Sequence, residues 1–256
     1  MKKLISSTRC GLVIKKCNME QPYAITTFCY GERYYNQTNR LIDSFVNFQD
    51  TPDIFVVTDN TDAIRKESFV KVKDIRDYNE KYSTYEKNYY GFDFSVKRFS
   101  LLFAFENGHE NVILTDTDVV RNDYIFSTEK IMNTFVGNSI GGQVVYNFSN
   151  EVHTNSMLGR RLLHYEKKFG IEFEKSQLNE MPEDCIQFIS IPHEKKFKFM
   201  ETWDKCIKIK DSDNLHNVPA GNIDEMCFAA LYNGIKCVNT SNKSVNLLIA
   251  KHEKWY

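Results

Sequence analysis

Proline and glycine are both scarce in this sequence, with 5 and 11 of its 256 residues. No stretch rich in serine, glycine or proline interrupts the chain, so nothing in it marks a linker between domains. Internal repeats and low-complexity tracts are also lacking. With 42% hydrophobic residues, the composition is globular, which excludes disordered and fibrous proteins. We therefore expect residues 1–256 to form a single domain with a core large enough for a deep site.

An excess of basic charge is lacking as well, because 33 Lys and Arg residues face 34 Asp and Glu residues. General polyanion binders carry such an excess, so the balance argues against a nucleic-acid partner. No apolar run approaches the length of a membrane span, and no signal peptide is visible. The seven cysteines have no CxxC spacing, which favours reduced thiols. We expect a soluble, cytoplasmic protein without an integral membrane segment.

Short continuous apolar runs alternate along the chain with segments of helical periodicity. The expected strands are 23–28, 53–59, 111–116, 142–146, 185–191 and 235–238. The expected helices are 34–48, 94–106, 157–169, 195–209 and 222–232. Residues 60–93 are polar and are expected to form loops with short elements. This alternation indicates an α/β fold with a mostly parallel central sheet flanked by helices, and such sheets bind ligands at the carboxyl ends of their strands.

Two aspartates, Asp116 and Asp118, directly follow the apolar strand 111–115. In an extended strand end, residues i and i+2 point the same way, so their carboxylates converge. Paired carboxylates suit a hard divalent cation, Mg²⁺ or Mn²⁺, which completes its shell with phosphate oxygens and water. The alternative is a capped, solvated strand end. A second Asp-x-Asp, at residues 211–213, has no apolar strand before it and is expected to be a solvated loop.

The segment 112–120, VILTDTDVV, resembles the metal-binding DxD strand of GT-A nucleotide-sugar glycosyltransferases. It is closest to their glycogenin-like and galactosyltransferase-like group, family 8. The resemblance implies one GT-A-type, Rossmann-like domain, with a nucleotide-binding half at about 1–120 and an acceptor-binding half at about 121–256. It also implies a transferase that depends on Mn²⁺ or Mg²⁺. The enzyme would move a sugar from a UDP- or GDP-sugar to a hydroxyl of a glycan or other acceptor.

The same resemblance assigns roles in donor binding to residues of the first half. Tyr34, followed by Leu41 and Ser44, is similar in spacing to the tyrosine that stacks on the nucleotide base in that group. Thr26 and Thr27 in the first strand and Asp59 after the second are expected near the base or ribose. The helix before the DxD motif carries Lys97 and Arg98, where the fold often places a basic residue that faces the donor. Because they are adjacent on a helix, at most one of the two is expected to face the phosphates.

Residues of the second half are assigned to the acceptor side and to the metal. Asp224 and Glu225 open a helix, as an acidic motif does in many GT-A enzymes. Asp224 is expected to lie nearest the reacting centre, with Glu225 secondary; the alternative is a pair of favourable charges in a first helical turn. His252 and Lys254-Trp255 resemble a closing motif of family 8, although its glycine and proline are missing. The resemblance implies that His252 is a metal ligand and that Lys254 contacts phosphate.

Two other functions fit parts of the sequence. Asp116-Thr117-Asp118-Val119 matches the DxDx[TV] loop of haloacid-dehalogenase-type phosphatases or phosphotransferases, in which Asp116 would be the nucleophile. That loop comes early in its fold, whereas 115 residues precede Asp116 here. A non-catalytic module that binds a nucleotide sugar or a carbohydrate on the same fold is the other alternative.

Overall fold

A seven-stranded sheet in the order β10-β6-β9-β4-β1-β2-β3 forms the centre of the molecule. The structure, a computed structural model, describes residues 22–48, 50–78, 96–122, 126–142, 145–146, 157–178, 181–182, 186–213, 215, 223–240 and 248–250. The strands of the sheet are β1 (Ala24–Cys29), β2 (Asp53–Thr58), β3 (Val70–Asp74), β4 (Asn111–Thr115), β6 (Ser139–Gly142), β9 (Ile186–Ser190) and β10 (Lys236–Asn239). β9 is antiparallel to both of its neighbours, β4 and β6, and every other pair is parallel. The mostly parallel α/β sheet expected from the sequence is confirmed.

Two small antiparallel ribbons accompany the main sheet. β5 (Val119–Arg121) pairs with β11 (Leu248–Ala250), and β7 (Val145–Tyr146) pairs with β8 (Met181–Pro182). Three residues, 116–118, separate the end of β4 from the start of β5. The first ribbon therefore brings a segment from near the end of the chain against the strand that follows the DxD motif.

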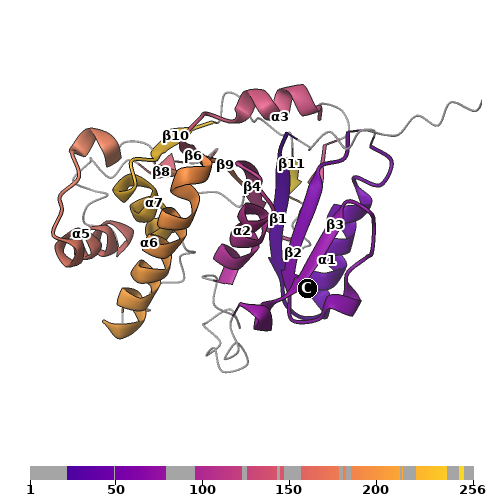
Figure 1. Cartoon of the computed structure of the whole chain (residues 1–256), viewed down its shortest axis with the longest axis horizontal. Coiled ribbons are helices and arrows are strands. Elements are labelled where there is room, and N and C mark those ends of the chain that lie inside the picture. Colours follow the sequence, from indigo (N-terminus) through magenta and orange to yellow (C-terminus); the bar gives the residue numbers. More distant parts are fainter. Residues whose placement is uncertain are drawn as a thin grey trace, which may run out of the picture.

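The helices connect the strands and cover both faces of the sheet (Figure 1). They are α1 (Glu32–Asp43), α2 (Lys97–Glu106), α3 (Thr128–Thr134), α5 (Met157–Phe169), α6 (His193–Ser212) and α7 (Ile223–Tyr232), with 3₁₀ turns η1 (Thr61–Ala63), η2 (Ile75–Asp77) and η5 (Lys175–Leu178). α1 starts directly after Gly31, whose φ of 83° is a conformation that favours glycine. α2 ends at Asn107-Gly108, with Gly108 at φ 94°, as the stop signal in the sequence predicts. Among the helices in the described ranges, none is long and apolar enough to cross a bilayer.

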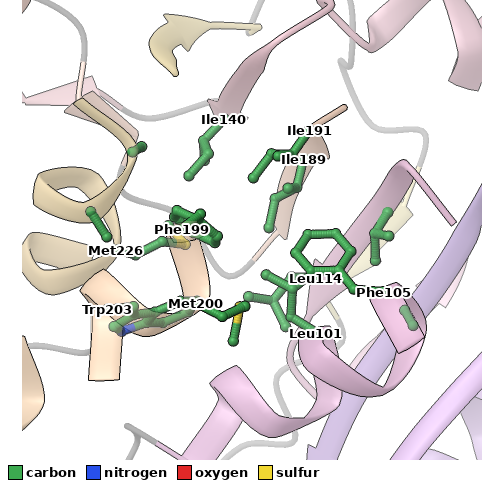
Figure 2. Close-up of a cluster of buried hydrophobic side chains, with 14 of the residues drawn as sticks. Leu101, Phe105, Leu114, Ile140, Ile189, Ile191, Phe199, Met200, Trp203 and Met226 are labelled. Carbon is green, nitrogen blue, oxygen red and sulfur yellow. The ribbon is translucent and has the colours of Figure 1, made fainter. Parts of the chain in front are cut away.

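Successive side chains of the central strands enter two different cores, because strand residues alternate between the faces of a sheet. On one face, α2, α6 and α7 pack around Leu114 and Ile189 (Figure 2). On the other face, Leu41 and Ile42 of α1 and Ile131 of α3 pack with Ile113 and its neighbours. A third cluster joins α5 to α6 and α7, so these three helices gather at one end of the molecule and α1 lies with β1–β3 at the other (Figure 1).

Several expected boundaries differ from the observed ones. Segment 70–74, expected within a loop region, is the edge strand β3, whose Lys71 and Lys73 alternate with valines. α1 stops at Asp43 instead of residue 48, and the expected strand 142–146 is split between β6 and β7. Asp211 belongs to the last turn of α6 instead of a loop, and Asp213 caps that helix.

Candidate active site

The DxD motif leaves the sheet at its carboxyl edge. Asp116 is the first residue after β4, and β4 pairs in parallel with β1, as β1 does with β2. Residues that follow these three strands therefore meet at one edge. Asp59, the first residue after β2, lies at this edge too. The structure thus places Asp116 at the edge predicted from the sequence, where the first strand, with Thr27, also ends.

The DxD motif spans a turn, because β4 ends at Thr115, Thr117 and Asp118 are turn residues, and β5 begins at Val119. The extended strand end expected from the sequence is therefore not observed. Leu114 packs into the core on the α2 face, whereas Ile113 and Val119 pack into the core on the α1 face. Thr117, in the turn, donates a hydrogen bond from its hydroxyl to the Oε1 of Gln37 on α1, at 2.7 Å. Ile113, Thr117 and Val119 therefore face α1.

The two aspartates of the motif flank Thr117 in the sequence. Asp116 forms an ion pair with Lys97 in the first turn of α2. Asp118 lies two residues further on, in the turn, and both aspartates are partly exposed. Asp116 therefore lies on the side of the segment opposite Thr117, toward α2. Within the ranges that the structure describes, no group of three His, Cys, Asp or Glu side chains gathers into a metal site.

Lys97 and Arg98 face different partners, as expected for neighbours on a helix. The Lys97 ammonium contacts Asp116, and its side chain is 19% exposed. Arg98 is buried, its Nη2 lies 3.1 Å from Oδ1 of Asp204 on α6, and its guanidinium lies 4.1 Å from the centre of the Phe99 ring. Lys97 is thus the member of the pair that the structure brings to the DxD motif.

Tyr35, to which the sequence assigns no role, binds Asp59. The hydroxyl of Tyr35 donates a hydrogen bond of 2.6 Å to Oδ1 of Asp59. Burial and this carboxylate raise the pKa of Tyr35 to about 12. Tyr34, the residue singled out, is partly buried and packs against the core on the α1 face. Nothing in the sequence separates the two rings, because both fit the helical pattern of 34–48.

Thr26 and Thr27 are fully buried and point to opposite faces of β1. The Thr26 hydroxyl lies 2.6 Å from the carbonyl oxygen of Ser100 and 3.2 Å from that of Phe55, so it ties α2 to the sheet. The Thr27 hydroxyl is buried on the α1 face and has no hydrogen-bond partner among the described residues.

His252 and Lys254 lie outside the described residues. The structure does describe β11, which ends at Ala250, two residues before His252 in the sequence. Ala250 is paired with Val119, the residue that follows Asp118. The chain therefore passes next to the DxD motif shortly before it reaches these two predicted site residues.

Asp224 and Glu225 are buried at the start of α7 and each has a basic partner. Oδ2 of Asp224 lies 3.1 Å from Nη1 of Arg161 on α5. Oε1 of Glu225 lies 2.8 Å from the Nζ of Lys210 on α6 and accepts a 3.4 Å hydrogen bond from the Tyr165 hydroxyl. No pattern in the sequence predicts these partners, because an arginine or lysine on an amphipathic helix usually faces water.

This buried cluster shifts the pKa values of its carboxyl groups in opposite directions. Burial and the adjacent Glu225 carboxylate raise the pKa of Asp224 well above its usual range, although Arg161 and Lys210 oppose the shift. Burial also acts to raise the pKa of Glu225, but Lys210 and a hydrogen bond from Asp224 outweigh it and lower that pKa. Asp224 is thus the carboxyl group of the pair that more readily takes up a proton.

α7 directs its first turn toward the edge where β4 ends. Only residues 233–235 separate the last turn of α7 from the start of β10, which is parallel to β6. The helix therefore returns along the sheet against the strand direction, and Asp224 lies toward the carboxyl edge. β6 and β4 are separated only by β9, so about 10 Å lies between the two strands in the plane of the sheet.

Comparisons with known proteins find their matches in structure and not in sequence. No family model matches the chain, and a search of curated proteins gives no match. The galactosyltransferase LgtC, solved with donor and acceptor sugar analogues, superposes with a TM-score of 0.52 at 11% identity, over 84% of this chain and 72% of LgtC. The chain has a GT-A-type fold. An active-site mutant of LgtC gives a TM-score of 0.51 at 11% identity, over 84% of this chain and 71% of the mutant.

The GT-A-type fold confirms the fold expected from the sequence. In this chain the fold includes an antiparallel strand, β9, between β4 and β6, and a two-stranded ribbon of β5 and β11. At 11% identity the likeness establishes the fold and not the reaction. The chemistry therefore has to be argued from the residues at the carboxyl edge.

Proposed function

We propose that this protein is a metal-dependent glycosyltransferase. It would move a hexose or pentose from a UDP- or GDP-sugar to a hydroxyl of a glycan or other acceptor. The observation that carries the proposal is the position of Asp116 and Asp118, which follow a central strand of a GT-A-type sheet at its carboxyl edge. The same likeness to LgtC, whose structure contains donor and acceptor sugar analogues, supports the reaction class.

Asp116 and Asp118 fit a divalent cation by their donor chemistry. They offer carboxylate oxygens two residues apart in the chain, which suits Mn²⁺ or Mg²⁺ together with phosphate oxygens and water. Both side chains are partly exposed, and Asp116 already pairs with one cationic group, Lys97. His252 would join them as a ligand, supported by the pairing of Ala250 with Val119. A bound metal ion would supply positive charge to the departing diphosphate.

The donor nucleotide would lie across the ends of β1 and β2. Tyr34 would stack on the base, Asp59 would accept from the base or ribose, and Thr27 would offer its hydroxyl. Thr26 would act indirectly, by holding β1 against α2, because its hydroxyl is bonded to α2. Lys97 and Lys254 would place fixed positive charge near the phosphates. Arg98 would support α2 through its contact with Asp204.

The second half would bind the acceptor, so residues 1–256 would act as one domain with about 1–120 for the donor and 121–256 for the acceptor. In the transfer, the bond between the sugar C1 and the diphosphate oxygen breaks, a bond from C1 to the acceptor oxygen forms, and the hydroxyl proton is released. Asp224 would accept that proton in an inverting reaction. In a retaining reaction it would position the acceptor or stabilise the oxocarbenium-like state. Glu225, held by Lys210, would support Asp224.

A phosphatase that uses Asp116 as nucleophile is the rival enzyme. In this chain the DxD motif follows the fourth strand, and β4 has an antiparallel neighbour, β9. The nucleophile loop of such phosphatases comes early in the fold, whereas Asp116 comes after four strands, so its position does not favour the phosphatase. A module that binds sugar nucleotides without turnover is the other rival, and it would keep donor binding but not transfer.

The experiment that separates these functions compares two hydrolysis reactions. Glycosyltransferases with a bound donor slowly hydrolyse it when no acceptor is present. We expect metal-dependent hydrolysis of UDP-sugars or GDP-sugars that is lost in Asp118→Ala, and no activity on a generic phosphate ester. Hydrolysis of the phosphate ester would favour the phosphatase, and donor binding without any hydrolysis or transfer would favour the binding module.

A further inference from the structure

A hydrogen bond to α1 holds Thr117, the central residue of the DxD motif. The Thr117 hydroxyl donates a 2.7 Å hydrogen bond to Oε1 of Gln37, and the side chains are 5% and 4% exposed. Both residues are polar, and Ile113 and Val119 of the same segment belong to the apolar core on this face. A buried polar group that loses its hydrogen-bond partner lowers the stability of the fold. The bond therefore favours one position of Thr117 relative to α1.

A second contact holds the same segment four residues later. The hydroxyl of Ser44, at the end of α1, accepts a 3.2 Å hydrogen bond from the backbone N–H of Arg121. The carbonyl oxygen of Ser44 accepts a 2.7 Å bond from Nε of Arg121. Gln37 and Ser44 are seven residues apart, two turns of helix, so they lie on the same side of α1. α1 thus holds the segment from Thr117 to Arg121 at both ends.

The remaining edge of the segment is held by β11. Ala250 pairs with Val119 and Leu248 pairs with Arg121, so β5 is confined between α1 and β11. These contacts hold Thr117, Val119 and Arg121. Asp116 lies on the other side of the segment, where it meets Lys97.

We propose that Gln37 and Thr117 are positioning residues for the metal-binding carboxylates. Through the buried hydrogen bond between them, α1 would fix the backbone between Asp116 and Asp118 and so set how the two carboxylates approach one cation. This inference rests on the proposed function, because it assumes that the aspartates bind Mn²⁺ or Mg²⁺. It adds residues that touch neither the metal nor the substrates. Residues that orient metal ligands without touching the metal typically weaken metal binding by about 10- to 100-fold when they are removed.

The test measures Mn²⁺ alone, without donor or turnover. Free Mn²⁺ is followed by electron paramagnetic resonance in a titration of the full chain. Thr117→Val and Gln37→Met remove the hydrogen bond and keep the size of the side chain, and Thr117→Ser keeps the hydroxyl. We expect about 10-fold weaker Mn²⁺ binding in Thr117→Val and Gln37→Met. The double variant is expected to lose no more than either single change, because both remove the same bond.

Thr117→Ser and a control on the same helix separate positioning from general stability. Thr117→Ser is expected to bind Mn²⁺ as the wild type does. Asn39 of α1 bonds to the backbone of the 63–65 segment instead, through Ala63 and Arg65, at 3.0 and 2.8 Å. Asn39→Ala is therefore expected to lower the melting temperature without changing Mn²⁺ affinity.

Failure of this inference and failure of the proposed function give different results. If the wild type and Asp118→Ala bind Mn²⁺ equally, the metal site itself is wrong. If Asp118→Ala loses Mn²⁺ but Thr117→Val and Gln37→Met bind like the wild type, the positioning role is wrong. A loss of affinity in Asn39→Ala equal to theirs would also contradict it. Should Thr117→Val not fold, Gln37→Met and Thr117→Ser give the same decision.

Discussion

Lys97 and Arg98 are adjacent in the chain, yet the structure gives them separate contacts. Lys97 meets Asp116, whose side chain is 33% exposed, whereas Arg98 is buried against Asp204. Thr117 between its two aspartates and Tyr35 beside Tyr34 show the same division. Tyr35 binds Asp59 at the carboxyl edge, whereas Tyr34 packs against the core on the α1 face. Packing therefore decides which of two adjacent residues lies at the candidate site.

The first prediction uses Lys97 and Arg98 as a matched pair. Lys97→Met is expected to weaken binding of a nucleoside diphosphate about tenfold, because one hydrogen bond to a charged group contributes about 1.5–3 kcal/mol. Its ion pair with Asp116 is partly exposed, so stability should change less than for a buried pair. Arg98→Met is expected to lower the free energy of unfolding by about 1–3 kcal/mol and to leave nucleotide affinity unchanged. Calorimetric titration and urea denaturation of both variants measure these effects, and the reverse pattern would contradict the assignment.

The second prediction concerns Tyr34. If its ring stacks on the base, Tyr34→Ala should weaken UDP or GDP binding by about 1–3 kcal/mol, the range for base–aromatic stacking. Tyr35→Phe is the matched variant, since it keeps the ring and removes the bond to Asp59. We expect it to leave stacking intact. Nucleotide affinity measured for both variants tests this, and an unchanged affinity in Tyr34→Ala would reduce Tyr34 to a packing role.

The third prediction concerns Asp224. Asp224→Asn is expected to reduce turnover about 100-fold or more and to leave donor affinity near that of the wild type. Because Asp224 is buried against Arg161, the change should also lower stability, by about 3–5 kcal/mol if the pair is fully disrupted. Turnover must therefore be measured well below the melting temperature of the variant. Near-wild-type turnover there would remove Asp224 from the mechanism.

At the scale of elements, strands with continuous apolar runs were predicted closely from the sequence. β1, β2, β4 and β9 all coincide with such runs to within one or two residues. β3 was missed because Lys71 and Lys73 interrupt its valines, a pattern that suits an exposed edge strand. Strand β6 lies earlier than the expected strand 142–146, because its sequence Ser139-Ile140-Gly141-Gly142 holds a single large apolar side chain and no apolar run. A Cβ at Gly141 would lie 2.4 Å from Cγ2 of Thr240, so this strand needs glycine there.

The candidate site was predicted only in part, for a physical reason. Asp116 and Asp118 are recognisable because two charges end a buried strand, which sequence alone reveals. Arg161 and Lys210 are not, since their burial depends on how α5 and α6 pack against α7. The Gln37–Thr117 bond likewise depends on a contact between residues 80 positions apart. Long-range polar partners of this kind follow from the tertiary fold and carry no local pattern.

The fourth prediction concerns the contact between α5 and the end of α6. Hydrogen bonds from Lys168 and His164 lower the pKa of Asp213 to about 2. An unfolded aspartate titrates near pH 3.9, so the stabilisation by Asp213 is present above about pH 4 and is lost as the pH falls toward 2. In urea denaturation, Asp213→Asn should be less stable than the wild type at pH 5, and the difference should shrink below pH 4. Asp62→Asn, at a solvated pair with Lys66, is the control. A difference that stays constant over this range would contradict the prediction.

At the scale of the whole molecule, one sheet joins the proposed donor and acceptor halves. β1–β4 come from the first half, and β6, β9 and β10 come from the second. β9 inserts between β4 and β6, so the halves share a core instead of packing as separate units. The DxD motif and the first turn of α7, with Asp224, both lie toward the carboxyl edge of this sheet.

The central claim is that Asp116 and Asp118 bind a metal ion that the donor needs. The most direct measurement is the thermal unfolding of the wild type and Asp118→Ala with a panel of UDP- and GDP-sugars, with and without Mn²⁺. A ligand at 100 times its Kd stabilises the folded state by about 2.7 kcal/mol. We expect one nucleotide sugar to raise the melting temperature of the wild type only with Mn²⁺ present, and to leave Asp118→Ala unchanged. Equal stabilisation without Mn²⁺, or in Asp118→Ala, would contradict the claim.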